Sequence, residues 1–127
     1  MTRVADLTGA ELALWVARVE GLEDPTIEGT VCQYVHHEEP GDDGWWTDYK
    51  PHEDWAIAGP IIEREHLVVW PYRILDQDDR ADGVQQDYAA KRIGMLDPEG
   101  SGPSYLIAAM RAFVASKFGE TVSEVAT

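Results

Sequence analysis

The sequence predicts an α+β fold in which a small, mainly antiparallel sheet of three to four strands carries the N- and C-terminal helices on one face. Three observations predict it: an amphipathic segment over residues 9–20, a second over residues 103–118, and short β-rich runs between them. The chain has 127 residues and a hydrophobic fraction of 44%, enough for a core without disulfides. We therefore expect a single domain over residues 1–127.

Residues 9–20 have the signals of a helix at both ends. Thr8 and Glu11 have the spacing of a capping box at the start, and Gly21 is a typical residue just beyond a helix end. Between these signals the large apolar residues recur on one helical face: Leu12, Trp15, Val16 and Val19.

Three runs rich in β-branched and aromatic residues predict strands. The first covers residues 27–36, and the second covers residues 67–70 and is expected to end at Pro71. The third, residues 84–93, is ambiguous, because its Ala-Ala-Lys-Arg section could be helical. Its position after a polar turn over residues 76–83 and between turn-rich segments favours a hairpin strand.

An acidic segment over residues 37–54 is predicted to be a long loop, because prolines and glycines interrupt it. Its aromatic residues, Trp45, Trp46 and Tyr49, are expected to anchor it on the body of the protein. Lys50 is its single basic residue, and its acidic residues are Glu38, Glu39, Asp42, Asp43, Asp48, Glu53 and Asp54.

The last helix is predicted to begin with Gly102 as its N-cap and Pro103 at its first position, and to stop at Gly119. It carries a broad apolar stripe, formed by Leu106, Ile107, Met110, Phe113, Val114 and Phe118. A neighbouring stripe of small residues would allow another element to approach closely: Ala108, Ala109, Ala112, Ala115 and Ser116. Residues 121–127 are predicted to be a frayed tail.

The net charge of −14 disfavours direct binding to nucleic acids or to anionic membranes, because both need clustered basic residues. An acidic protein instead suits a basic macromolecular partner. Cys32 is the only cysteine, and no long apolar run occurs, which together favour a cytoplasmic protein. The sequence predicts no cofactor and leaves the oligomeric state open.

Three segments together resemble one family, the phage NinX-like proteins of unknown function: residues 15–21, 49–65 and 106–119. The most specific parts are Asp54-Trp55 leading into Gly59-Pro60-Ile61-Ile62-Glu63, and Leu106-Ile-Ala-Ala-Met-Arg111. The resemblance implies a small protein of phage or prophage origin. With the acidic charge, it makes a basic host or phage protein the expected partner. It supplies no activity and no catalytic residues to carry over.

Histidines lie beside carboxylates in several places, and these are ligand types for Zn²⁺ or Mn²⁺. If the acidic loop folded back, the side chains that would converge are His36 or His37, His52 and Asp54. No spacing here matches a metal signature, so solvated surface histidines are the favoured interpretation and no metal site is predicted.

The segment from Tyr49 to Glu65 is the best candidate for a ligand or partner site, through Tyr49, Asp54, Trp55, Glu63 and Arg64. Asp54 and Glu63 flank a predicted turn, and paired carboxylates beside a Trp can serve glycosidic chemistry. The simpler interpretation is that Asp54 caps the turn, while Glu63 and Arg64 form ion pairs.

These observations favour a non-enzymatic accessory protein that binds a macromolecular partner, with acidic mimicry of nucleic acid as one way of doing so. The alternative is a protein that binds a small ligand or a metal, or catalyses a reaction, through the Tyr49–Glu65 segment.

Overall fold

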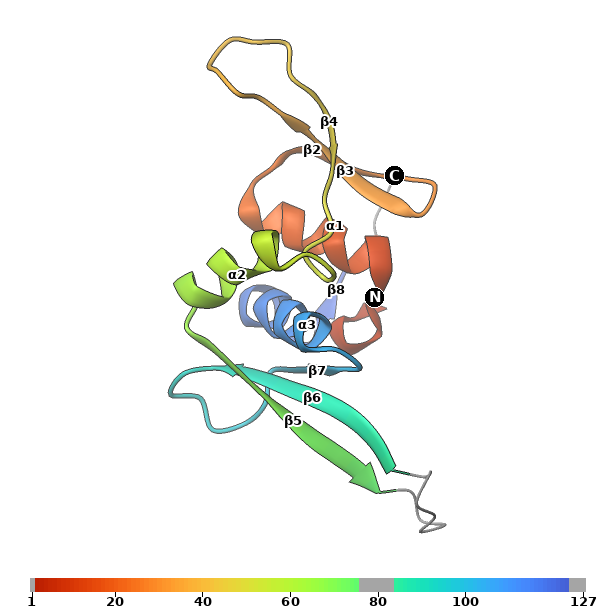
Figure 1. Ribbon diagram of the computed structural model, residues 1–127, viewed down its shortest axis with the longest axis vertical. Helices are drawn as coiled ribbons and strands as arrows, with labels where there is room; N and C mark the ends of the chain where they lie inside the picture. Colours follow the sequence, from red (N-terminus) through yellow and green to blue (C-terminus); the bar gives the residue numbers. More distant parts are fainter. Residues whose placement is uncertain (1, 76–83, 124–127) are drawn as a thin grey trace.

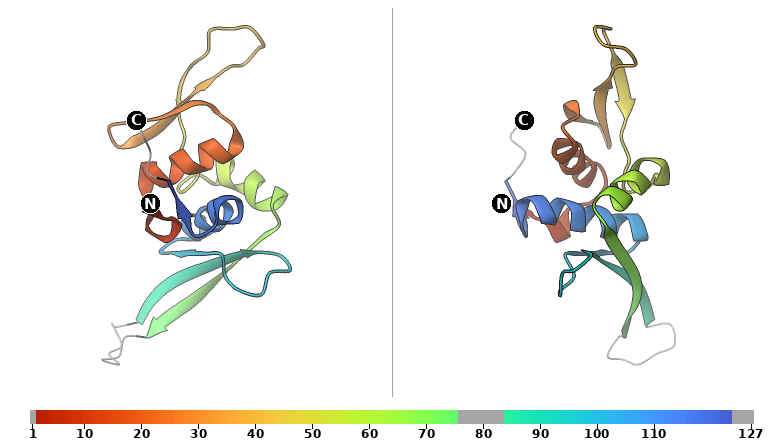
Figure 2. Two further views of the ribbon diagram at one scale, coloured as in Figure 1. Left: turned by 180° about the vertical axis from the view of Figure 1, so that it is seen from behind. Right: turned by 90° about the vertical axis from the view of Figure 1, so that its left-hand side faces the viewer.

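The computed structural model describes residues 2–75 and 84–123 of the chain. The fold is α+β, as predicted, and the described residues form three α-helices: α1 (Gly9–Glu20), α2 (Trp55–Arg64) and α3 (Tyr105–Phe118). A short 3-10 helix over Val4–Asp6 precedes α1. Figures 1 and 2 show the helices in a central layer, with one sheet on either side of it.

The strands form three separate antiparallel sheets, where the sequence predicted one. β2 (Glu23–Glu28), β3 (Val31–His36) and β4 (Trp45–Asp48) form a sheet on the α1 side. The sheet on the other side contains β5 (Leu67–Leu75), β6 (Val84–Arg92) and β7 (Gly100–Gly102). A two-stranded sheet joins the ends of the described chain, β1 (Thr2–Arg3) and β8 (Thr121–Val122).

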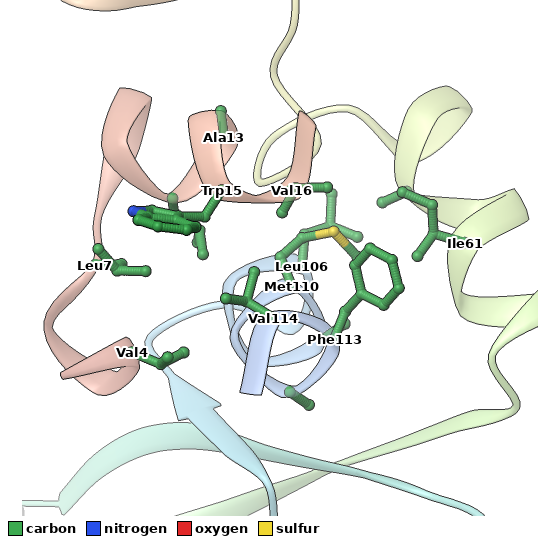
Figure 3. Packing of buried hydrophobic residues seen from close by; sticks show 14 of the residues in the cluster. Val4, Leu7, Ala13, Trp15, Val16, Ile61, Leu106, Met110, Phe113 and Val114 are labelled. Carbon is green, nitrogen blue, oxygen red and sulfur yellow. The ribbon is translucent and has the colours of Figure 1, made fainter. Parts of the chain in front are cut away.

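The expectation that both terminal helices share one face of a sheet is not confirmed. α1 packs on β2 and β3, whereas α3 packs on β5, β6 and β7 and on α1. The reason is that α3 is apolar on two sides. Its large side chains point toward α1 and α2 in Figure 3, and its buried alanines, Ala108, Ala109 and Ala112, leave room for a second layer.

β7 crosses α3 at backbone contact distance. A Cβ added at Gly100 would lie 2.3 Å from the backbone nitrogen of Ala112 and 2.7 Å from the carbonyl oxygen of Ala108. Close approach over the small-residue stripe is therefore confirmed. Arg111 is buried beside this crossing and donates hydrogen bonds to the carbonyl oxygens of Leu7 (3.0 Å) and Ser101 (2.8 Å).

The helix termini partly match the predictions. α1 has the predicted bounds, and Gly21 follows it in the left-handed conformation with a φ of 71°. Thr8 is its N-cap residue, but the Thr8 side chain makes no capping hydrogen bond. α3 begins two residues later than predicted: Ser104 is the N-cap and accepts from the Ile107 N–H (3.1 Å), because Gly102 pairs with β6 instead.

The strand boundaries required three corrections. The predicted strand 27–36 is a hairpin of β2 and β3 that turns at Gly29, where φ is 63°. The predicted loop 37–54 contains β4. β5 continues through Pro71 instead of ending there, since β5 lies at a sheet edge, where a missing N–H is tolerated.

β6 confirms the predicted hairpin strand. The predicted turn over residues 76–83 lies outside the described residues. The predicted frayed tail is wrong at its start, because Val122 is buried and pairs with Thr2; residues 124–127 also lie outside the described part.

Candidate functional site

The segment from residue 55 to residue 64 is helix α2, not the turn that Gly59-Pro60 suggested. Asp54 is its N-cap, and its Oδ1 atom accepts a hydrogen bond from the Ala56 N–H (2.9 Å). The capping role predicted for Asp54 is therefore right, although it caps a helix. Pro60 lies exposed inside the helix. Because proline is rare in helix interiors, its presence led to the prediction of a turn here.

The helix separates the two carboxylates that were candidates for paired chemistry. Asp54 precedes α2 and Glu63 lies near its end, so their backbones are about 13 Å apart along the helix axis. Glycosidases hold their two carboxyl groups about 5–10 Å apart across the bond that they cleave. Both residues are exposed, and the geometry gives no support to a catalytic pair.

Arg64 holds the three helices together. Its guanidinium donates two hydrogen bonds to Glu20 at the end of α1 (2.8 and 3.1 Å) and one to Glu65 (2.9 Å). Glu65 in turn pairs with Lys117 of α3 (3.0 Å), and the guanidinium lies over the Phe113 ring. The Arg64 hydrogen bond is the main cause of the lowered pKa of Glu65. The predicted ion pairing of Arg64 is confirmed.

Tyr49 is an anchor of the acidic segment and not an exposed binding residue. Only 6% of its surface is exposed, and its ring packs edge-on against Tyr34 with the centroids 5.6 Å apart. Its backbone N–H donates to the carbonyl of Cys32 (2.8 Å), and burial raises the pKa of its hydroxyl. Cys32 itself is packed, with 1% exposed.

Trp55 lies at the mouth of a cavity between the starts of α2 and α3. It is 55% exposed, and its ring stacks obliquely on Tyr105 with the centroids 4.8 Å apart. The cavity has a volume of about 430 Å³, and His52 forms part of its wall. The His52 side chain is 10% exposed, its Nδ1 atom has no hydrogen-bond partner among the described residues, and burial lowers its pKa.

The four candidate metal ligands lie in different surroundings. His36 packs against Trp45 with ring centroids 5.3 Å apart, whereas His52 lines the cavity beside Trp55 and Asp54 caps α2. His37 lies between Glu23 and Asp42 and bonds to both. Residues 2–75 and 84–123 contain no group of three or more His, Cys, Asp or Glu side chains placed to hold a metal ion.

The contacts of His37 are an electrostatic clamp on the acidic segment. Hydrogen bonds to Glu23 and Asp42 raise the pKa of His37. The Oδ2 atom of Asp42 accepts from the backbone N–H groups of Glu38 (2.9 Å) and Glu39 (3.0 Å), and bonds of this kind lower the pKa of Asp42. The turn between β3 and β4 is therefore held in a defined shape by its own acidic residues.

The residues that sequence reasoning misplaced are Trp45 and Trp46. They were expected to anchor the loop, but they are 50% and 53% exposed on β4. β4 belongs to the hairpin that projects away from the helices (Figures 1 and 2). The run Trp45-Trp46-Thr47 after Gly44 is a β-prone signal that could have predicted this strand.

Comparison with known families identifies the chain. The family described as "Bacteriophage P22, NinX" matches residues 3–117. A search of curated proteins gives no match. None of the described helices is both long enough and apolar enough to cross a membrane. Because the match extends from before α1 to near the end of α3, the chain belongs to the phage NinX family.

Proposed function

We propose that the protein acts by binding a basic macromolecular partner, and that it does so without catalysis. The surface that carries this proposal is the tryptophan edge, which we define as strand β4 with Trp45 and Trp46 and the adjoining acidic turn with Glu38, Glu39, Asp42 and Asp43.

The exposure of Trp45 and Trp46 is the single observation on which the proposal depends. Half of each side chain faces solvent, at 50% and 53%, on neighbouring positions of one strand. Leaving large aromatic surface in water forgoes hydrophobic stabilisation of about 25 cal/mol per Å². Trp is also enriched at the centres of protein interfaces, where it carries much of the binding energy. A partner that covers this strand would recover that energy.

Charge defines the partner. The net charge is −14, and exposed carboxylates border the two tryptophans. Complementary charge speeds encounter and suppresses wrong partners, so a protein with a basic face is favoured. Asp42 accepts from the backbone N–H groups of Glu38 and Glu39, and this fixed backbone supports a turn that presents its carboxylates as phosphates are presented. The proposal therefore includes a partner that otherwise binds nucleic acid.

Affinity capture from a bacterial lysate tests the proposal. The wild-type protein is compared with a Trp45→Ala/Trp46→Ala variant and with Trp55→Ala, a matched control whose Trp is similarly exposed (55%) on α2. We expect a basic protein to be retained by the wild type and by Trp55→Ala, to be lost from the double variant, and to be released by moderate salt. Equal capture by all three proteins would contradict the proposal.

Competition with DNA tests the mimicry. A captured protein that uses one basic face for both partners should be displaced by duplex DNA, with a steep dependence on salt. Capture that is unaffected by saturating DNA would exclude mimicry and leave the rest of the proposal standing.

A second candidate function is binding of a small planar ligand in the cavity between α2 and α3. The observation that favours it is His52, whose Nδ1 atom lacks a partner in the described structure while the exposed Trp55–Tyr105 pair offers a stacking face. Ligand screening by NMR should then shift the Trp55 indole signal, and Trp55→Ala should abolish the response. Screening for Zn²⁺ and Mn²⁺ by melting temperature, with His52→Ala as control, tests the metal alternative.

A further inference from the structure

We infer that the partner contributes an extended, basic segment that pairs with β4 and becomes an additional strand of the β2–β3–β4 sheet. The inference rests on the proposed function and names its mode of recognition. It depends on three features of the sheet: an open edge, the protection of other edges, and the side chains that border the open one.

The open edge follows from the strand order. β3 lies between β2 and β4, and no other described strand pairs with β4. The Tyr49 N–H donates to the carbonyl of Cys32 (2.8 Å), so these residues form a hydrogen-bonded pair. Hydrogen-bonded and non-hydrogen-bonded pairs alternate along an antiparallel ladder. Thr47 and Trp45 therefore turn their backbone groups toward β3, while Trp46 and Asp48 present theirs outward.

Other edge strands carry features that hinder pairing. β2, the opposite edge of the same sheet, contains Pro25, which has no N–H, and Asp24, whose φ is 49°. Its register is irregular between Glu23 and Thr26. β5, an edge of the second large sheet, contains Pro71. Proline and irregular register are common means of blocking unwanted strand addition. β4 contains no proline and pairs in continuous register.

The side chains of β4 would flank an added strand on both faces of the sheet. Trp45 stands over His36 on one face, with the ring centroids 5.3 Å apart. Trp46 is paired with Val35 on the opposite face, where Gln33 donates to Asp48 (2.8 Å). Directly opposite residues in a sheet have Cβ atoms about 5 Å apart, so residues of an added strand would contact each indole.

The charge of this edge decides which strand can join it. A second copy of the chain would bring Asp48 and the acidic turn against their own like charges, with each copy carrying −14. Like charges that face each other across strands are destabilising. A segment in which Lys or Arg alternates with apolar residues would instead satisfy the outward backbone groups. Its apolar side chains would cover Trp45 on one face, and its basic side chains would lie beside Trp46 and Asp48 on the other.

The test separates the backbone contact from the side chains. Asp48→Pro removes the outward N–H and the carboxylate, whereas Asp48→Ala removes the carboxylate alone; both lose the bond to Gln33. The probe is a short synthetic peptide in which Lys and Val alternate, with a version N-methylated at alternate residues as its control. Binding is followed by Trp fluorescence, and NMR contacts between Trp45 and His36 show whether the hairpin is intact in each variant.

We expect Asp48→Ala to bind the plain peptide at most about fivefold more weakly than the wild type, because one exposed carboxylate is lost, and Asp48→Pro to bind it about tenfold more weakly than Asp48→Ala. The N-methylated peptide should bind the wild type about tenfold more weakly than the plain one, which tests the inference without altering the protein. Equal binding of the two peptides, or no binding of the plain peptide, would overturn strand addition. If lysate capture still depended on Trp45 and Trp46, the proposed function would stand.

Discussion

At the scale of single residues, Gly100 shows how closely the second large sheet approaches the helical layer. Its α-carbon faces the backbone of α3, where an added Cβ would meet Ala112 N at 2.3 Å. Backbone atoms cannot yield as a flexible side chain can. The glycine is therefore required by packing rather than by backbone conformation, which explains why no turn signal in the sequence marked it.

Gly100→Ala should destabilise the protein by about 3 kcal/mol or more, because β7 must move away from α3 to accommodate the methyl group. Chemical denaturation measures the change in the free energy of unfolding. Ser101→Ala, one residue along the same strand, is the matched control and should change it by less than about 0.5 kcal/mol. Equal effects of the two substitutions would contradict the close crossing.

Met110→Asp should unfold the protein. Met110 is 0% exposed in the core between the helices (Figure 3), and an unpaired buried charge costs several kcal/mol out of a typical stability of about 5–15 kcal/mol. Thermal unfolding followed by circular dichroism is the measurement. Met95→Asp, at a position that is 41% exposed, should retain a cooperative transition near that of the wild type.

At the scale of elements, the β2–β3–β4 sheet is held at its outer end by charge. His37 joins Glu23 of β2 to Asp42 of the acidic turn. A raised pKa for His37 means that the folded state binds its proton more tightly than the unfolded state does. The backbone N–H of Glu39 is the main cause of the lowered pKa of Asp42, and the bond to His37 lowers that pKa further.

The stabilisation from His37 should be present below its ordinary pKa of about 6.5 and should disappear as the pH rises through its higher pKa in the folded protein. The contribution of Asp42 has the opposite dependence and is lost as the pH falls through its lowered pKa. NMR titration of the His37 ring should give a pKa above 6.5. In the His37→Gln variant, the free energy of unfolding should no longer fall as the pH rises through the pKa of His37. If it fell as it does in the wild type, the clamp would be excluded.

The pairing of β1 with β8 makes the end of the described chain part of the fold. Val122 is 3% exposed, and the Val4 N–H donates to the Glu120 carbonyl (2.8 Å). Val122→Ala should therefore cost about 1–3 kcal/mol in unfolding free energy, measured by denaturant titration. The exposed neighbour Ser123→Ala should be neutral. A neutral result for Val122→Ala would restore the prediction of a frayed tail.

At the scale of the whole molecule, a chain of ion pairs joins all three helices. Glu20, Arg64, Glu65 and Lys117 link α1, α2 and α3 in that order. Arg64→Met, which keeps an apolar stem but removes the charge, should destabilise the protein by about 1–2 kcal/mol, with a smaller loss at high salt. Exposed Glu63→Ala is the control in the melting experiment. A loss that does not vary with salt would contradict an electrostatic role.

The sequence predicted the features of the fold that local residue patterns determine, above all the residues at which the first and last helices end. The apolar spacing and Gly21 defined α1, and Gly119 marked the end of α3. It did not predict that the strands divide into separate sheets, because strand pairing depends on contacts between distant residues. The β2 and β4 strands were missed because a turn at Gly29 and a run of acids interrupted their patterns.

The candidate site was only partly predictable for similar reasons. Gly59-Pro60 is a strong turn signal, and tertiary packing of Ala58 and Ile61 against the core overrides it. Trp45 and Trp46 were expected to be anchored because Trp is usually buried; Tyr49 is the residue that anchors the segment. Whether a Trp or Tyr side chain is exposed depends on how the whole chain folds, and the local composition of a segment does not determine it.

The hydrogen bond from Arg111 to the carbonyl of Leu7 also has a kinetic consequence. It joins residues 104 positions apart, and α1 and α3 meet across a similar separation. Closing so long a loop is entropically unfavourable before the native contacts form, so the central layer cannot assemble until α3 has been synthesised. Until then the side of α1 that packs on α3 stays uncovered, and the incomplete chain is the form most exposed to aggregation and proteolysis.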